Sequence, residues 1–195
     1  MPYKISLQGN IACGKSTFLK NLEEYLLKKP QTFTFTTLKE PISIWEPFFK
    51  AFKDQIIGGY TLQKHIQQSL IQRDSIQYLT DFVIMERSLL SANQVFSPIL
   101  IQNGDLTQTQ FDQLIREQPA HSDQFIVFIE TDPTICLSRI NIRQQPGDEL
   151  ASLSYLEQIQ KRHKMWFDQE TRPKLRVHNN TENDIQEFMS YIISL

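Results

Sequence analysis

The chain has 195 residues, of which 40% are hydrophobic; this is enough for one sizeable core, and we expect a single domain over residues 1–195. A formal net charge of −2 argues against a surface that binds a nucleic-acid polymer. No apolar run reaches the ~18 residues of a membrane helix and no targeting segment precedes the first predicted strand, so we expect no membrane contact and a cytoplasmic location.

The chain begins with a predicted strand over residues 3–8, a glycine-rich loop and a predicted helix from residue 17. The loop reads Gly9-Asn10-Ile11-Ala12-Cys13-Gly14-Lys15-Ser16, which fits the phosphate-binding pattern G-x-x-x-x-G-K-S. Its glycines allow close backbone approach, and the loop amides and the helix N-terminus then point at phosphate oxygens. Lys15 supplies a cation for the β- and γ-phosphates, and the Ser16 hydroxyl is a ligand for Mg²⁺. Together with Thr17, this segment predicts a nucleotide phosphate site.

Strands and helices alternate along the rest of the chain. Alternating or continuous apolar runs predict strands over residues 32–38, 81–85, 124–130 and 174–178. Helical spacing predicts helices over residues 42–55, 61–79, 89–102, 107–118, 133–143 and 150–170, with a last amphipathic helix after residue 181. This order is typical of an α/β fold, a P-loop three-layer sandwich in which helices flank a five-stranded parallel sheet.

Polar residues follow several of the predicted strands, and ligands bind such sheets at the carboxyl ends of the strands. Glu40 follows the second strand, where a carboxylate can act as a general base. Glu86 and Arg87 follow the third strand, where P-loop proteins have a metal-linked carboxylate. Arg139 and Arg143 are four residues apart on one helix face. Beside a Pro-Gly segment, these arginines predict a lid over residues 139–150 that closes on phosphates.

Five stretches taken together resemble the deoxyribonucleoside kinase family. They are Gly9–Ala12 leading into the P-loop, Glu40-Pro41-Ile42 with Trp45, Thr61-Leu62-Gln63, Glu86-Arg87-Ser88, and Arg139-Ile140 with Arg143 followed by Tyr155-Leu156-Glu157. The resemblance implies that MgATP phosphorylates the 5′-hydroxyl of a deoxyribonucleoside, and that the protein is a homodimer with the 89–102 helix as a candidate interface.

The resemblance also assigns catalytic roles. Glu40 is the base, Arg87 supports Glu40 and the reacting oxygen, and Glu86 holds Mg²⁺ with Ser16. The cations that bind the transferred phosphate and ATP are Lys15, Arg139 and Arg143. Asn179-Asn180-Thr181 resembles the loop that holds the adenine of the phosphate donor, with Asn180 as its contact.

In the nucleoside pocket, the resemblance makes Gln63 the partner of the base and Phe96 its stacking ring, with Ile42, Trp45 and Phe48 as walls. Leu70 and Ala92 stand where deoxycytidine kinase-like members have an Arg–Asp pair. They leave an apolar gap for the thymine methyl group, so we predict thymidine and deoxycytidine as substrates. A hydrophobic pocket discriminates one methyl group by only ~1–3 kcal/mol, so the specificity is expected to be broad.

The sequence departs from the family where it binds the sugar. Phe52 stands at the position of a sugar-binding tyrosine, and the lid acid falls on Asp148 or Glu149. We therefore predict weak recognition of the 3′-hydroxyl. Gln145 stands where typical lids carry a further arginine, which leaves this lid one charge short.

Two other functions remain open. A nucleoside monophosphate kinase, such as a thymidylate kinase, shares the fold and the arginine-bearing lid, but the Glu86-Arg87-Ser88 motif and Glu40-Pro41 favour the nucleoside. A regulatory NTP-binding module is the third reading; the chain has neither an N-K-x-D guanine motif nor a D-x-x-G motif after the third strand.

Overall fold

The computed structural model describes residues 2–28, 32–120, 123–145, 147–178 and 181–194. At its centre is a parallel sheet of five strands in the order β2-β3-β1-β4-β5. The strands are β1 (Tyr3–Gly9), β2 (Phe35–Leu38), β3 (Phe82–Glu86), β4 (Phe125–Ile129) and β5 (Lys174–Val177). The predicted α/β fold with a five-stranded parallel sheet is therefore confirmed, and four of the strands lie within two residues of their predicted bounds.

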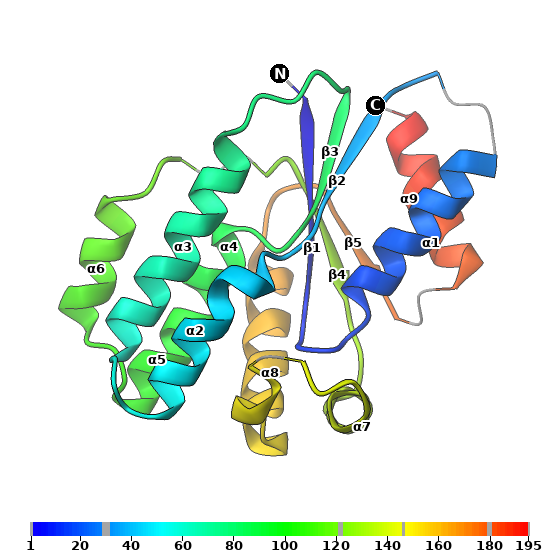
Figure 1. Ribbon diagram of the computed structural model, residues 1–195. Helices are drawn as coiled ribbons and strands as arrows, with labels where there is room; N and C mark the ends of the chain where they lie inside the picture. The colour runs from blue at the N-terminus through cyan, green and yellow to red at the C-terminus, as the bar shows by residue number, and fades with distance from the viewer. Residues whose placement is uncertain (1, 29–31, 121–122, 146, 179–180, 195) are drawn as a thin grey trace.

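The carboxyl ends of the strands meet at one edge of the sheet, at the bottom of the view in Figure 1. The register pairs Leu7 of β1 with Glu86 of β3, and Gly9 of β1 with Ile129 of β4. Ile129 in turn pairs with Val177, so strand ends that are far apart in the sequence lie side by side. Loops that carry the candidate site residues leave from this edge.

Helices cover both faces of the sheet (Figure 1). On one face, α1 (Lys15–Lys28) and α9 (Glu182–Ile193) pack together, and α7 (Pro133–Arg143) adds Cys136 and Ile140 to the same core. The opposite face carries α3 (Gly59–Ser75), α8 (Leu153–Gln169) and the short helices after β3. The remaining helices are α2 (Ile42–Lys53), α6 (Gln108–Arg116) and a 3₁₀ turn, η2 (Asp148–Leu150). No helix in the described ranges has both the length and the apolar character needed to cross a membrane.

The predicted helix over residues 61–79 begins and ends earlier than expected. It starts at Gly59, whose amide donates to the carbonyl of Asp105 at 3.1 Å. A Cβ at this position would lie 2.5 Å from that carbonyl oxygen, so only glycine allows the contact. The helix ends at Ser75 because Ile76 is extended, with φ −64° and ψ 133°.

The predicted helix over residues 89–102 is interrupted. It consists of α4 (Leu89–Ser91), a π-helical segment η1 (Ala92–Phe96) and α5 (Ser97–Asn103). Pro98 explains the interruption, since it has no amide hydrogen and its ring would clash with the carbonyl of Gln94 in a regular α-helix. The π segment carries Ala92 and Phe96, two of the predicted pocket residues, and widens the turn that presents them.

Candidate active site

A cavity of about 940 Å³ lies at the carboxyl edge of the sheet, a size typical of sites that bind small organic ligands. It extends from the P-loop to helices α2, α3 and α5. The predicted site residues that line it are Ile11, Ala12, Gly14, Lys15, Ser16, Thr17, Glu40, Ile42, Trp45, Phe52, Gln63, Glu86, Arg87, Ala92, Phe96, Arg139, Arg143 and Asp148. The parallel sheet thus brings the predicted phosphate and nucleoside residues into one cavity.

Three P-loop residues predicted to bind the nucleotide do not line the cavity. Gly9 has a φ of +147°, and a Cβ there would lie 2.5 Å from the carbonyl oxygen of Ile129. Asn10 is buried and donates from Nδ2 to the carbonyl of Leu156 in α8 at 2.8 Å. Cys13 is fully buried beneath the loop. These residues shape and anchor the loop, whose backbone amides the sequence analysis assigns to the phosphate oxygens.

Two predicted substrate residues also lie away from the cavity. The ring of Phe48 stacks on His65 of α3, with the centroids 3.8 Å apart, and Phe49 lines the cavity in its place. The reason is helical geometry: Phe49 lies one turn after Trp45, and their rings meet edge to face at 6.2 Å. Glu149 is exposed and does not line the cavity, whereas its neighbour Asp148 is buried and does. Asn180 lies outside the described residues.

Glu40 is held between two cations at the floor of the cavity. Its Oε1 lies 2.7 Å from Nε of Arg87 and 3.4 Å from Nζ of Lys15. Arg87 also donates from Nη1 to the carbonyl of Gly9 at 3.0 Å, and Lys15 donates to the carbonyl of Asn10 at 3.0 Å. The ends of β1, β2 and β3 are thereby joined through one carboxylate.

The cations keep Glu40 ionised. Burial by itself raises the pKa of a carboxyl group, but the charges of Arg87 and Lys15 outweigh it and hold the pKa of Glu40 below its ordinary value. An ionised carboxylate can accept a proton, which is the property that a general base needs.

Glu86 has the opposite electrostatic setting. Its side chain is 3% exposed, and burial together with the neighbouring charge of Glu40 raises its pKa. One carboxylate oxygen, Oε1, is buried without a hydrogen-bond partner among the described residues, and the side chain shares a hydrogen bond with Ser16. Mg²⁺ is commonly held by one or two carboxylates together with substrate phosphates and water. The unpartnered oxygen beside the Ser16 hydroxyl fits such a cation.

The two arginines of the predicted lid have different partners. Arg139 donates from Nη1 to the carbonyls of Ala12 and Cys13, both at 3.1 Å, so it holds the P-loop itself. Arg143 forms a two-pronged ion pair with Asp148, at 2.7 and 3.0 Å. The predicted lid cation and the predicted lid acid therefore balance one another, which the sequence did not indicate.

The far end of the cavity is built from helices, and most of its lining side chains are apolar. Trp45, 4% exposed, donates from Nε1 to Ser69 Oγ at 2.6 Å, which fixes the plane of its indole ring. Gln63 is 3% exposed, and its Oε1 accepts a hydrogen bond from Ser97 at 3.4 Å. A buried amide that still faces a cavity has donor and acceptor capacity for a ligand.

Apolar residues form the rest of this end. Leu70 and Ala92, at the positions predicted to leave a gap, both line the cavity. Phe96 lies beneath Arg87, whose guanidinium carbon is 4.7 Å from the ring centroid. One face of the Phe96 ring is thus used by the charged cluster, so this ring connects the two ends of the cavity.

Some lining residues were given no role from the sequence. Tyr155 belongs to a stretch that carried the resemblance, and burial raises the pKa of its hydroxyl to about 12, so it stays protonated. Asn103, Asp105 and Gln158 also line the cavity. The i, i+4 relation to Trp45 could have indicated Phe49, but no pattern in the sequence points to the others.

Comparison with known proteins agrees with this geometry. The model of the deoxynucleoside kinase family matches residues 5–194. Mitochondrial thymidine kinase 2 of Homo sapiens, and likewise that of Macaca fascicularis, is 28% identical over 84% of this chain and 63% of its own length. A Fowlpox virus (strain NVSL) protein named "Probable deoxycytidine kinase" is 24% identical over 89% of this chain and 75% of its own length. The chain thus spans less than two thirds of the thymidine kinase 2 proteins that it matches.

Proposed function

The chain belongs to the deoxynucleoside kinase family, and from this premise we propose that it transfers the γ-phosphate of ATP to the 5′-hydroxyl of a deoxyribonucleoside. The observation that carries the proposal is the position of Glu40. This ionised carboxylate lies between Lys15 of the phosphate loop and Arg87, and it lines the same cavity as the buried amide of Gln63. A base at the junction of a phosphate site and an apolar nucleoside site is what the transfer requires.

In the proposed reaction, Glu40 takes the proton of the 5′-hydroxyl. The 5′ oxygen then bonds to the γ-phosphorus, the bond from that phosphorus to the β–γ bridging oxygen breaks, and ADP leaves. Arg87 keeps the Glu40 carboxylate oriented, and Lys15 offsets charge on the β- and γ-phosphates. Arg139 lines the same cavity from the lid helix and adds positive charge beside the P-loop.

Mg²⁺ belongs to this proposal as the ion that neutralises phosphate charge when it is bound. The residues that would hold it are Ser16 and Glu86. Their support is the buried Oε1 of Glu86, an acceptor that has no partner among the described residues.

Thymidine and deoxycytidine are the proposed nucleosides. Gln63 would pair with the pyrimidine edge, and Leu70 and Ala92 would leave room beside its position 5 for a methyl group. Asp148 and Phe52 would face the sugar, with weak recognition of the 3′-hydroxyl because phenylalanine has no donor.

The test is ADP production from MgATP with thymidine, deoxycytidine, deoxyadenosine, deoxyguanosine, thymidylate or no acceptor. We expect the highest kcat/KM with thymidine or deoxycytidine. Activity with thymidylate alone would make the protein a monophosphate kinase and remove Glu40 as the base. Hydrolysis that needs no acceptor would leave only the nucleotide site and favour a regulatory module.

A homodimer is also proposed, with the family resemblance as its support. The candidate interface is the 89–102 helix, in which Gln94 and Gln102 are exposed, whereas Leu89 to Asn93 are buried within the subunit. Light scattering coupled to size-exclusion chromatography measures the mass directly, and a mass near 22.9 kDa would contradict the dimer.

A further inference from the structure

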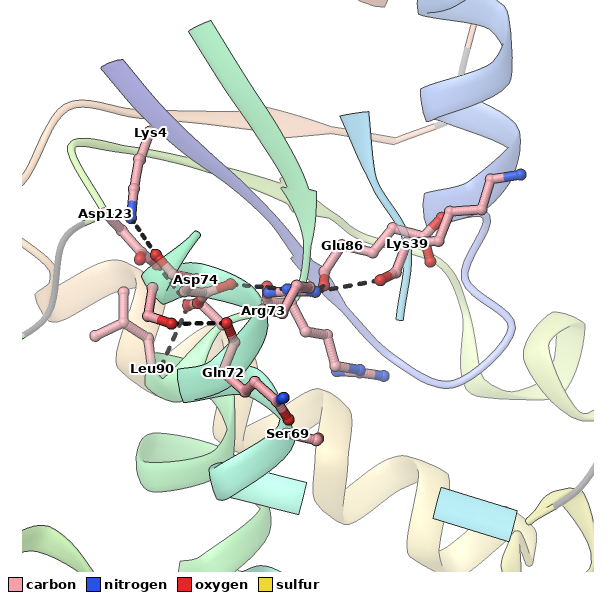
Figure 2. A network of polar contacts seen from close by, with 12 residues as sticks. Lys4, Lys39, Ser69, Gln72, Arg73, Asp74, Glu86, Leu90 and Asp123 are labelled. Atoms are coloured by element: carbon pink, nitrogen blue, oxygen red, sulfur yellow. Dashed lines mark hydrogen bonds and ion pairs between the residues drawn. The ribbon is translucent and has the colours of Figure 1, made fainter. Parts of the chain in front are cut away.

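Arg73, near the carboxyl end of α3, reaches across to the strand ends that carry the catalytic pair. It donates from Nη1 to the carbonyl of Glu86 at 2.8 Å and from Nη2 to the carbonyl of Arg87 at 2.8 Å. Nη1 also lies 3.4 Å from the carbonyl of Lys39, the residue before Glu40. Figure 2 shows Arg73 beside Glu86 at the end of β3 and Lys39 after the end of β2. One planar group therefore binds main chain on both sides of the Glu40–Arg87 ion pair.

The main chain at this point needs such a partner. β3 ends at Glu86, and Arg87 has a φ of +54°, a left-handed conformation that a non-glycine residue adopts only at a cost. The amide of Arg87 still donates to the carbonyl of Leu7 at 2.9 Å, which continues the pairing of β3 with β1 past the end of the strand. Arg73 satisfies the carbonyls on either side of this turn, and so favours the conformation that directs the Arg87 side chain at Glu40.

Arg73 is itself held in place. Its Nε donates to Asp74 Oδ1 at 2.7 Å, and the Arg73 side chain is 10% exposed. The carbonyl of Asp74 accepts from Lys4 Nζ at 2.8 Å, which ties the end of α3 to β1 (Figure 2). A guanidinium whose orientation is already fixed loses less conformational entropy when it donates to two carbonyls.

We propose that Arg73 is a positioning residue for phosphoryl transfer: its contacts with the ends of β2 and β3 set the distance and angle between Glu40 and Arg87. Arg73 does not line the cavity, so it acts through these two residues and not on the substrate. The inference rests on the proposed role of Glu40 as the base. According to this inference, a residue of α3, which belongs to neither the P-loop nor the lid, helps to set the relative position of Glu40 and Arg87.

Charge adds to this effect. The groups that act on Glu40 from the surrounding elements are Lys15 of α1, Arg87 and Glu86 of the β3 end, Arg143 of α7 and Arg73 of α3. Burial raises the pKa of Glu40, while Arg87, Lys15 and, more weakly, Arg73 lower it. Arg73 thus adds positive charge to the cluster that surrounds the Glu40 carboxylate.

The test uses Arg73→Lys, which keeps the charge but loses the planar pair of donors, and Arg73→Gln, which loses both. We expect kcat to fall about 10- to 100-fold in both variants, because displacements near 1 Å have effects of this size. KM for thymidine and for ATP should stay within about threefold, since no substrate contact is removed.

Arg116→Lys is the matched control, because Arg116 is exposed on α6, where its Nε donates to the carbonyl of Asp112 in its own helix. Its kcat should equal that of the parent. All rates are measured below the melting temperature of each variant. A kcat of Arg73→Lys within threefold of the parent would overturn the inference, even if the melting temperature fell.

If neither Arg73 variant folds, Asp74→Asn is measured. It weakens the hold on the guanidinium, and kcat should fall less but in the same direction; an unchanged kcat would refute the inference. Glu40→Gln, run alongside, separates the two proposals. If it keeps the parent's kcat, the role of Glu40 as the base is wrong, whereas normal rates in the Arg73 variants alone would refute only the role of Arg73.

Discussion

At the P-loop end of the cavity, charged side chains hold one another, whereas at the helical end most of the lining side chains are apolar. Arg87 contacts Glu40 at 2.7 Å, and Arg73 holds the backbone behind them. At the other end, the amide of Gln63 has one long contact, 3.4 Å from Ser97. The two ends belong to one cavity but rest on different kinds of interaction.

The proposed reaction explains the difference. Phosphoryl transfer depends on charges whose positions are set before the substrate arrives, because preorganised dipoles and ions need no rearrangement during the reaction. Recognition of a base depends on shape and on a few hydrogen bonds, and an apolar wall discriminates weakly. We therefore expect substitutions at the charged end to change rates and substitutions at the apolar end to change preferences.

The largest effect is expected from Glu40→Gln. Removing the base should lower kcat about 10²- to 10⁴-fold with thymidine, while KM for ATP changes little. Steady-state rates of ADP formation measure both. Because the pKa of Glu40 is lowered, the parent should stay active as the pH falls to the ordinary range of a glutamate and lose activity only below it.

Glu40→Asp serves as the matched control, since it keeps the carboxylate and shortens the side chain. It should retain an acid limb, whereas Glu40→Gln should have none. An acid limb that persists in Glu40→Gln would show that another group titrates and that the two ends differ less than described.

The next effect concerns the apolar end. The double variant Leu70→Arg with Ala92→Asp introduces a charged pair into the gap proposed for the methyl group. The ratio of kcat/KM for thymidine to that for deoxycytidine should fall about 10- to 200-fold, the range that a hydrophobic pocket gives for one methyl group. Each single variant is the control, because an unpaired buried charge should lower activity with both nucleosides. An unchanged ratio would place the base elsewhere in the cavity.

A smaller effect is expected on the free energy of unfolding, which the buried charge of Glu86 should lower. The raised pKa of Glu86 means that the folded protein disfavours its ionised form, so at pH 7 this charge opposes folding. Glu86→Gln should raise the free energy of unfolding by about 0.5–2 kcal/mol while lowering MgATP-dependent activity. Denaturant unfolding at pH 7 measures the gain.

The raised pKa of Glu86 also predicts how the free energy of unfolding depends on pH. The penalty exists above the unfolded pKa of a glutamate, near 4.5, and disappears when Glu86 is protonated in both states. The stability difference between Glu86→Gln and the parent should therefore shrink as the pH is lowered through the folded pKa towards 4.5 and below. A variant that is less stable than the parent at pH 7 would contradict the electrostatic interpretation.

The smallest effect is expected from Phe52→Tyr at the sugar-facing wall. A new hydroxyl there would add one hydrogen bond to the 3′-hydroxyl, worth about 0.5–1.5 kcal/mol. The kcat/KM for thymidine should rise severalfold relative to that for 3′-deoxythymidine. Phe48→Tyr is the control, because Phe48 stacks on His65 outside the cavity. Equal changes with both nucleosides would show that residue 52 does not face the sugar.

Local patterns in the sequence were sufficient for the scaffold and for the edge of the sheet at which the candidate site lies. A glycine-rich loop between a strand and a helix, and polar residues directly after buried strands, predicted the parallel sheet and the edge at which Lys15, Glu40 and Glu86 meet. These predictions depend on periodicity and on the geometry of parallel strands, which short stretches of sequence carry.

Only the tertiary structure decided which side chains meet across elements. It placed Phe49 in the cavity lining and Phe48 outside it, and it paired Arg143 with Asp148. It also brought Arg73 to the carbonyls of Glu86 and Arg87. Such contacts depend on how whole helices pack and on where a strand ends, and a left-handed residue such as Arg87 has no signature in composition or spacing. The physical reason is that side-chain partners are selected by packing in three dimensions, whereas strands and helices follow from neighbours along the chain.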